Sequence, residues 1–118
     1  MMIINKKFPP YGKKLFEFYR EGIKPSNDIF IFLGDDAWKR AKLFLEIHWT
    51  TLLLNDSKPN EYRWDFVRGS SVLIFDTSEV GSEIIRHLAY ELLRWGATRV
   101  VVILVNYTLI VFRQGNDL

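Results

Sequence analysis

The feature that most constrains the fold is the alternation of short, wholly apolar segments with segments of helical periodicity. Three segments are apolar almost throughout and rich in β-branched or aromatic residues, namely DIFIFLG (28–34), SVLIF (71–75) and RVVVILV (99–105). Strands that are apolar on both faces are typical of parallel sheets, which are covered on both sides. WTTLLL (49–54) predicts a further strand, and YTLIVF (107–112) predicts either a fourth buried strand or an edge strand.

Helical periodicity fills the intervals between these strands. After residues 35–36, apolar side chains recur at helical spacing up to His48, and Asp35 or Asp36 is a suitable N-cap. A cleaner amphipathic helix follows Asp76, with Thr77 or Ser78 as its expected N-cap, Gly96 as its C-cap glycine and Glu91 on its polar face. The pattern predicts an α/β fold, a Rossmann-like three-layer α/β/α domain with a mainly parallel sheet of four to five strands.

Length and composition limit the class of protein. A chain of 118 residues with 48% hydrophobic and 25% charged residues is typical of one soluble domain. There are no cysteines, which excludes disulfides and thiolate metal sites. No segment approaches the roughly 20 apolar residues of a membrane span, and Lys6, Lys7, Pro9 and Pro10 interrupt any signal-peptide core. We therefore expect a cytoplasmic protein without a membrane partner.

The positive charge is concentrated at the N-terminus. Residues 1–24 contain six basic and two acidic residues, whereas the rest of the chain has a small acidic excess. We therefore divide the chain into a basic aromatic arm (1–27) and a single α/β domain (28–118), with a short helix expected at 13–20. The expected nucleic-acid-binding residues are Lys6, Lys7, Tyr11, Lys13, Lys14 and Arg20.

Two interpretations of this arm are open. Its lysines could neutralise phosphates while Phe8, Tyr11, Phe16, Phe18 and Tyr19 stack on bases. Alternatively, the aromatic rings pack on the domain and the lysines are only solvated. The arm is separate in sequence from the acidic body and carries most of the positive charge, which favours the first interpretation as a hypothesis. Under this hypothesis the expected partner is nucleic acid or a nucleoprotein complex.

Carboxylates follow two of the predicted strands. Asp35 and Asp36 come after the first apolar strand, and Asp76 and Glu79 come after SVLIF. Ligands of parallel α/β sheets bind beyond the carboxyl ends of the strands, where these residues should lie. Oxygen ligands suit Mg²⁺, so these four residues are the candidates for a weak metal site. The alternative is that they cap helices and complement helix dipoles, in which case no cofactor is needed.

One stretch resembles a known family. WDFVRGSSVLIFDTSEVGSEIIRHLAYELLRWGATRVVVIL is similar to the second half of the Toprim domain of phage and plasmid primase-helicases. The matching residues are Trp64, Gly69, Val72, Asp76, Gly81, Gly96, Ala97 and Val100. IFIFLGDDAWKRAKLF resembles the family's first strand and helix, so the resemblance covers residues 28–105.

The departures from the family pattern bear on activity. Leu33 stands where the family's catalytic glutamate precedes Gly34, and Ser78 stands where the second aspartate of the Asp-x-Asp pair belongs. Of those three carboxylates only Asp76 remains. The resemblance therefore implies a degenerate, non-catalytic Toprim-like domain.

The expected function is that of an accessory protein of a phage, plasmid or integrated element that binds nucleic acid or a nucleoprotein. Two other classes stay open. One is a protein-interaction module, such as an inhibitor of a host system or a homodimer, using exposed Trp38, Trp64 and a free edge of the last strand. The other is a Mg²⁺-dependent nuclease or phosphotransfer enzyme with a reduced carboxylate site.

Overall fold

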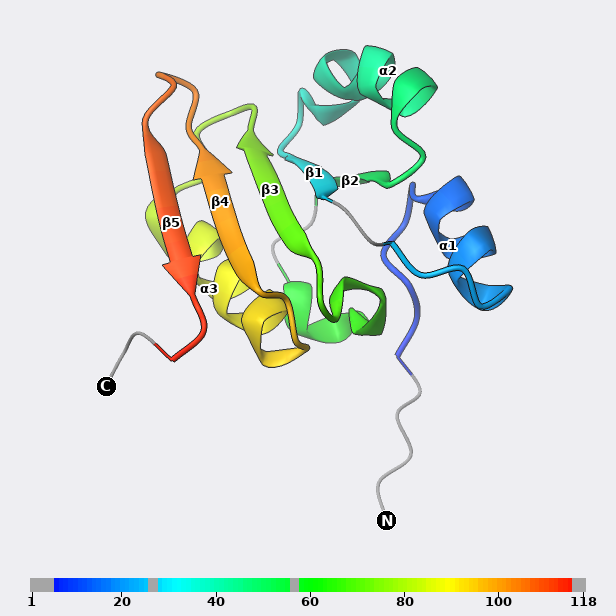
Figure 1. Ribbon diagram of the computed structural model, residues 1–118. Helices are drawn as coiled ribbons and strands as arrows, with labels where there is room; N and C mark the ends of the chain where they lie inside the picture. The colour runs from blue at the N-terminus through cyan, green and yellow to red at the C-terminus, as the bar shows by residue number, and fades with distance from the viewer. Residues whose placement is uncertain (1–5, 26–27, 56–57, 116–118) are drawn as a thin grey trace.

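The computed structural model describes residues 6–25, 28–55 and 58–115 and contains one five-stranded sheet with helices on both of its faces (Figure 1). The elements are α1 (Lys13–Arg20), β1 (Ile29–Leu33), α2 (Ala37–Ile47), β2 (Thr51–Leu54), β3 (Ser71–Asp76), α3 (Ser82–Arg94), β4 (Arg99–Ile103) and β5 (Leu109–Arg113), with short 3-10 turns at Pro59–Glu61 and Asp65–Val67. The strand order is β2-β1-β3-β4-β5. The first four strands are parallel, and β5 is antiparallel to β4. The predicted α/β fold is confirmed.

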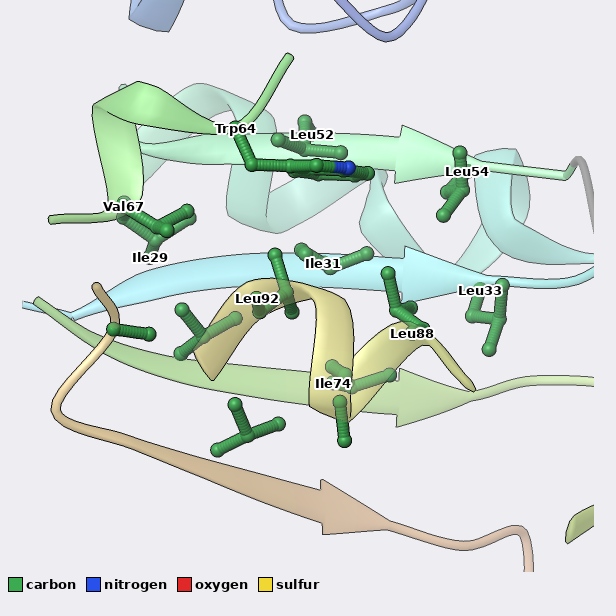
Figure 2. Packing of buried hydrophobic residues seen from close by; sticks show 14 of the residues in the cluster. Ile29, Ile31, Leu33, Leu52, Leu54, Trp64, Val67, Ile74, Leu88 and Leu92 are labelled. Atoms are coloured by element: carbon green, nitrogen blue, oxygen red, sulfur yellow. The ribbon is translucent and has the colours of Figure 1, made fainter. Parts of the chain in front are cut away.

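The strands bury both of their faces in the centre of the sheet. On one side, here called the α3 face, the odd-numbered residues of β1 and the even-numbered residues of β3 and β4 pack with α1 and α3. On the other side, here called the α2 face, Phe30, Phe32, Leu53 and Phe75 pack with α2. Figure 2 shows the larger of these two clusters, which includes Trp64 from the connection between β2 and β3. This two-sided burial is the reason that β1 reads as apolar at every position.

The N-terminal arm packs on the domain and is not detached from it. Leu15 and Phe16 of α1 are buried in the main core, and the Phe8 ring stacks on Phe16 with centroids 4.6 Å apart. The carbonyl of Tyr11 accepts a hydrogen bond from the backbone N–H of Leu53 on the outer edge of β2 (3.1 Å). The arm therefore covers an edge of the sheet. Residues 26–27, at the predicted boundary, lie outside the described residues.

The predicted helix caps are confirmed only in part. Helix α3 begins at Ser82 after Gly81, so neither Thr77 nor Ser78 is its N-cap. Asp36 occupies the N-cap position of α2, but its side chain makes no capping hydrogen bond. The C-cap prediction is confirmed, because Gly96 has φ +106° and the Gly96 and Ala97 N–H groups close a Schellman motif at the end of α3.

Two side chains expected at the surface are buried. Glu91 accepts hydrogen bonds from Arg94 Nη1 (2.9 Å) and Trp95 Nε1 (3.1 Å), and these contacts offset the cost of removing its carboxylate from water. Trp64 is fully buried, and its Nε1–H donates to the Pro59 carbonyl (2.8 Å). Trp64 therefore has no face to offer a partner.

None of the helices in the described ranges has the length and apolar character that a membrane crossing needs.

Candidate functional site

The four predicted metal-binding carboxylates do not gather around one point. Within residues 6–25, 28–55 and 58–115, no three histidine, aspartate or glutamate side chains are close enough to hold a metal ion. Asp35, Asp36 and Glu79 are exposed, whereas Asp76 is 7% exposed. The Oδ1 atom of Asp76 accepts hydrogen bonds from the backbone N–H groups of Ser78 and Val80, both at 3.3 Å. Asp76 therefore holds the turn that leads from β3 towards α3.

The carboxyl ends of β1 and β3 are held tightly together. Thr77 Oγ1 donates to the Leu33 carbonyl (2.9 Å), and Ser78 Oγ accepts from the Asp35 N–H (3.2 Å). Gly34 between them has φ +119°, and a Cβ there would overlap the side chains of Ser78 and Thr77. This is the topological switch point of a 2-1-3-4 strand order, the usual ligand crevice of such sheets. Here side-chain hydroxyls occupy the space above the glycine.

The two positions that depart from the Toprim pattern lie beside Asp76. Leu33 and Asp76 are register partners on β1 and β3, and the Leu33 side chain is buried in the main core. Ser78 uses its hydroxyl to join the two loops. Neither side chain can act as an acid or base at neutral pH, so the proton-transfer role of a catalytic glutamate has no substitute at these positions.

A mostly apolar cavity of about 440 Å³ opens beside Asp76 at the carboxyl ends of β3 and β4. Asp76, Glu79 and Arg86 contribute charges of both signs, and Ile110 and Phe112 of β5 contribute part of the apolar wall. The volume is suited to a small molecule. Asp76 and Glu79 are carboxylates in the lining, but no group of three possible metal ligands is present among the described residues, so the cavity does not by itself indicate a metal-dependent reaction.

A second cavity combines positive charge with aromatic surface. It has a volume of about 300 Å³, lies where the arm meets the end of α2 and the strand β2, and is here called the arm groove. Its lining residues are Tyr11, Lys13, Lys14, Trp38, Leu45, His48, Trp49, Thr51 and Leu53. The side chains of Tyr11 and Trp38 are 64% and 60% exposed. Exposed rings beside lysines are the elements that single-stranded nucleic-acid sites use.

Three residues of the arm groove, Tyr11, Lys13 and Lys14, are in positions that cost the folded protein stability. Lys13 and Lys14 occupy the first turn of α1, which contains no acidic residue, so their charges oppose the positive end of the helix dipole. Tyr11 has φ +63°, in the left-handed region that non-glycine residues rarely adopt. Residues held at some cost in free energy cluster at functional sites, and a bound phosphate would relieve the repulsion of the two lysines.

The structure brings three of the six predicted nucleic-acid-binding residues together. Tyr11, Lys13 and Lys14 line the arm groove. The Lys6 ammonium donates to the Asn60 carbonyl (2.6 Å), and the Arg20 guanidinium lies over the Phe8 ring at 4.9 Å from its centroid. Lys7 is exposed and forms an isolated backbone bridge with Tyr62.

Most of the arm's aromatic rings contact the domain. Phe16 is buried, Phe8 packs beside it, Phe18 meets Trp49 edge-on and Tyr19 contacts Phe66. Among the five arm aromatics, Tyr11 alone is largely exposed. The packing interpretation therefore holds for the others.

Sequence reasoning did not place Trp38, His48 and Trp49 in a site with the arm. His48 is exposed, with its ring 4.8 Å from that of Phe30. The sequence feature that could have indicated this site is Trp38, a large ring next to the buried Ala37. The same helix carries three exposed basic residues, Lys39, Arg40 and Lys42.

A polar network holds the arm to the connection between β2 and β3. Asp65 accepts hydrogen bonds from the Tyr19 hydroxyl (2.8 Å) and from Nε and Nη2 of Arg63 (2.9 and 2.6 Å). Burial alone would raise the pKa of Asp65, but the hydrogen bonds from Arg63 and Tyr19 outweigh it and lower that pKa. Burial and the hydrogen bond to Asp65 raise the pKa of Tyr19. This network stabilises the position of α1.

Comparison of the chain with family models, curated proteins and solved structures finds no match. The likeness to Toprim domains is therefore an inference from the residues at 28–105. The functional argument rests on the chemistry of the arm groove.

Proposed function

We propose that this protein binds single-stranded nucleic acid in the arm groove, as a cytoplasmic, non-catalytic accessory protein. The observation that carries the proposal is the shared location of two exposed rings, Tyr11 and Trp38, and two lysines, Lys13 and Lys14. Stacking on an aromatic side chain contributes about 1–3 kcal/mol per base and tolerates any base. The lysines add a sequence-independent attraction to phosphates.

The proposal assigns a separate role to each pair of side chains. Tyr11 and Trp38 lie on different elements, the arm and the start of α2, so a strand in the groove would place bases against rings from both. Lys13 and Lys14 stand at the amino end of α1, where backbone N–H groups also favour an anion. The bases are therefore expected towards the rings and the backbone phosphates towards the start of α1.

A binding role agrees with the side chains at the carboxyl ends of the strands. The buried Leu33 and the loop-joining Ser78 supply no acid or base beside Asp76. The resemblance to Toprim domains extends the proposal to the context of a phage, plasmid or integrated element, where the protein would act on nucleic acid or a nucleoprotein.

The test is fluorescence anisotropy of labelled single-stranded DNA, single-stranded RNA and double-stranded DNA across a salt series. We expect single strands to bind more tightly than the duplex. Replacing both lysines (Lys13→Gln/Lys14→Gln) should raise the Kd about tenfold at low salt and flatten the plot of log K against log salt by about 1.4, because two phosphate contacts are lost. Trp38→Ala should also raise the Kd at least about fivefold.

The matched control is Lys24→Gln/Arg86→Gln, which removes two exposed positive charges that do not line the groove. An equal loss of affinity in the control would show that net charge, and not the groove, attracts the strand. Absence of binding at low salt by the unmodified protein would overturn the proposal.

The same measurement with Mg²⁺ separates the enzyme class from the binding class. A Mg²⁺-dependent nuclease would cleave the labelled strands and lose this activity in Asp76→Asn. A binding protein leaves the strands intact, and its affinity is unchanged by that substitution because Asp76 does not line the arm groove.

A further inference from the structure

Strand β5 is an edge of the sheet, and no strand pairs with its outer side within residues 6–25, 28–55 and 58–115. It is the last strand in the order β2-β1-β3-β4-β5, and four of its five residues are exposed. Natural edge strands usually carry lysine, proline or a bulge that prevents pairing with another chain. The segment LIVFR has apolar side chains on both faces, and Arg113 at its end is its single charge.

The backbone groups of the free edge can be assigned from the hairpin. The Leu104 N–H donates to the Thr108 carbonyl (2.9 Å), so these two residues form a hydrogen-bonded pair at the start of the β4–β5 ladder. Hydrogen-bonded and non-hydrogen-bonded pairs alternate along an antiparallel ladder. Leu109, Val111 and Arg113 therefore direct their N–H and C=O groups away from β4, towards the free edge.

The edge is held in a fixed position. Gln114 Nε2, directly after β5, donates to the carbonyls of Leu93 (2.5 Å) and Ala97 (3.1 Å) at the end of α3. Phe112 meets the Tyr90 ring of α3 edge-on with centroids 5.7 Å apart. A strand fixed in this way presents its outward N–H and C=O groups without first having to become ordered.

We propose that two copies of this protein form a two-fold symmetric dimer by antiparallel pairing of their β5 strands, centred on Val111. Pairing two identical strands antiparallel creates a two-fold axis automatically, and such isologous dimers are the commonest oligomers. In this register Val111 faces its own counterpart, and Leu109 faces Arg113 of the second copy. All three residues with outward backbone groups would then be paired.

The side chains are complementary to themselves in this register. On the α3 face, Ile110 of each copy would stand opposite Phe112 of the other, an aromatic and β-branched pair of the kind that stabilises sheets. On the α2 face, the aliphatic stem of Arg113 would cover Leu109, with its guanidinium in water. No like charges oppose each other, because Arg113 is the strand's single charged residue and lies at its end. This charge pattern favours a second copy as the occupant.

The surface area buried between the two copies limits the affinity of the dimer. The α2 face of β4 and β5 carries four apolar residues that are all at least partly exposed, namely Val101, Ile103, Leu109 and Val111. In the dimer, these residues from the two copies would lie side by side and form one apolar surface twice as large. A five-residue edge nevertheless lies at the low end of interface sizes, below the roughly 800 Å² per partner of a standard interface. We therefore expect a concentration-dependent dimer with a Kd in the micromolar range.

The first test uses engineered cysteines, because the chain contains none of its own. In Val111→Cys the two sulfurs would meet across the axis, where opposed Cα atoms are about 5.5 Å apart, within the range a disulfide spans. In Leu109→Cys the two positions would be about 14 Å apart, four residues along the strand. Mild oxidation should cross-link Val111→Cys at least tenfold faster than Leu109→Cys. Equal rates, or no cross-linking, would overturn the proposed register.

The second test is sedimentation velocity between about 1 and 300 μM. Leu109→Lys should raise the dimer Kd at least tenfold, whereas Leu43→Lys should leave it unchanged. Leu43 is a matched control because it is an exposed leucine on α2, 64% exposed against 61% for Leu109. Val111→Pro should also abolish the dimer, since it removes an outward N–H without breaking a ladder bond to β4. A protein that is monomeric at every concentration, or a dimer insensitive to both β5 variants, would overturn the proposal.

Discussion

At one edge of the sheet every residue of β2 is buried, whereas at the other edge four of the five residues of β5 are exposed. The two strands are similarly apolar, TLLL against LIVFR. The difference is what covers them. The arm lies along β2, with the Tyr11 carbonyl bonded to the Leu53 N–H, and α2 packs on its other face. Along β5 the described structure places β4 at one edge and α3 on one face, and it shows no strand at the other edge (Figure 1).

This comparison suggests a division of functions between the two edges. The cover of β2 creates the arm groove, since the groove lies where the arm meets β2 and α2. The open edge of β5 offers the surface proposed for the second copy. A dimer through β5 would place two arm grooves at the two outer edges of one continuous sheet, and two linked sites bind a long strand more tightly than one.

The largest expected difference is between truncations at the two edges. Leu52→Ala in β2 should lower the free energy of unfolding by about 2–5 kcal/mol, because it leaves a cavity in the core. Leu109→Ala in β5 should change it by less than about 0.5 kcal/mol, because the side chain is already in water. Urea unfolding at a concentration that keeps the protein monomeric measures both. Similar losses at the two positions would show that β5 is covered in solution.

An intermediate effect is expected from the network that holds the covering arm. Asp65→Asn should lower the free energy of unfolding by about 1–2 kcal/mol at pH 7, because charge-assisted hydrogen bonds to Arg63 and Tyr19 are weakened. The pKa of Asp65 is lower in the folded protein than in the unfolded chain. Its contribution is therefore full above about pH 4 and is lost as the pH falls through the folded-state pKa.

The measurement for this prediction is urea unfolding of both proteins between pH 7 and pH 2.5. The difference in stability between the parent and Asp65→Asn should shrink as the solution becomes more acidic. A difference that stays constant over this range would mean that the carboxylate charge of Asp65 does not stabilise the arm.

The smallest expected effect lies at the start of the covering helix. Lys14→Glu should raise the free energy of unfolding by about 0.3–1 kcal/mol, since an acidic residue in the first turn favours the helix dipole. The same substitution should weaken binding of single-stranded DNA more than Lys13→Gln/Lys14→Gln does, by repelling phosphates. Thermal unfolding and fluorescence anisotropy of the one variant give both values. If Lys14→Glu is less stable than the parent, Lys14 stabilises the helix, and the proposal that its role is to bind phosphates loses this support.

Much of the fold could be predicted from local patterns. The helix at 13–20, the C-cap at Gly96 and all five strands follow from periodicity and turn residues, because these signals act between residues close in sequence. The site could be predicted only in part. Tyr11, Lys13 and Lys14 were candidates from composition, but the groove also needs Trp38 and Trp49 from elements further along the chain.

The sequence by itself determined that this chain forms a mainly parallel α/β sheet and that its N-terminus carries excess positive charge. Tertiary structure decided which apolar side chains became core and which stayed exposed. Trp64 and Phe16 are buried while Trp38 and Tyr11 are exposed, although all four are large aromatic side chains. The physical reason is that burial depends on which distant segment supplies the covering surface. The arm packs against β2 and does not contact β5 in the described structure. No pattern of neighbouring residues specifies which edge of the sheet the arm covers.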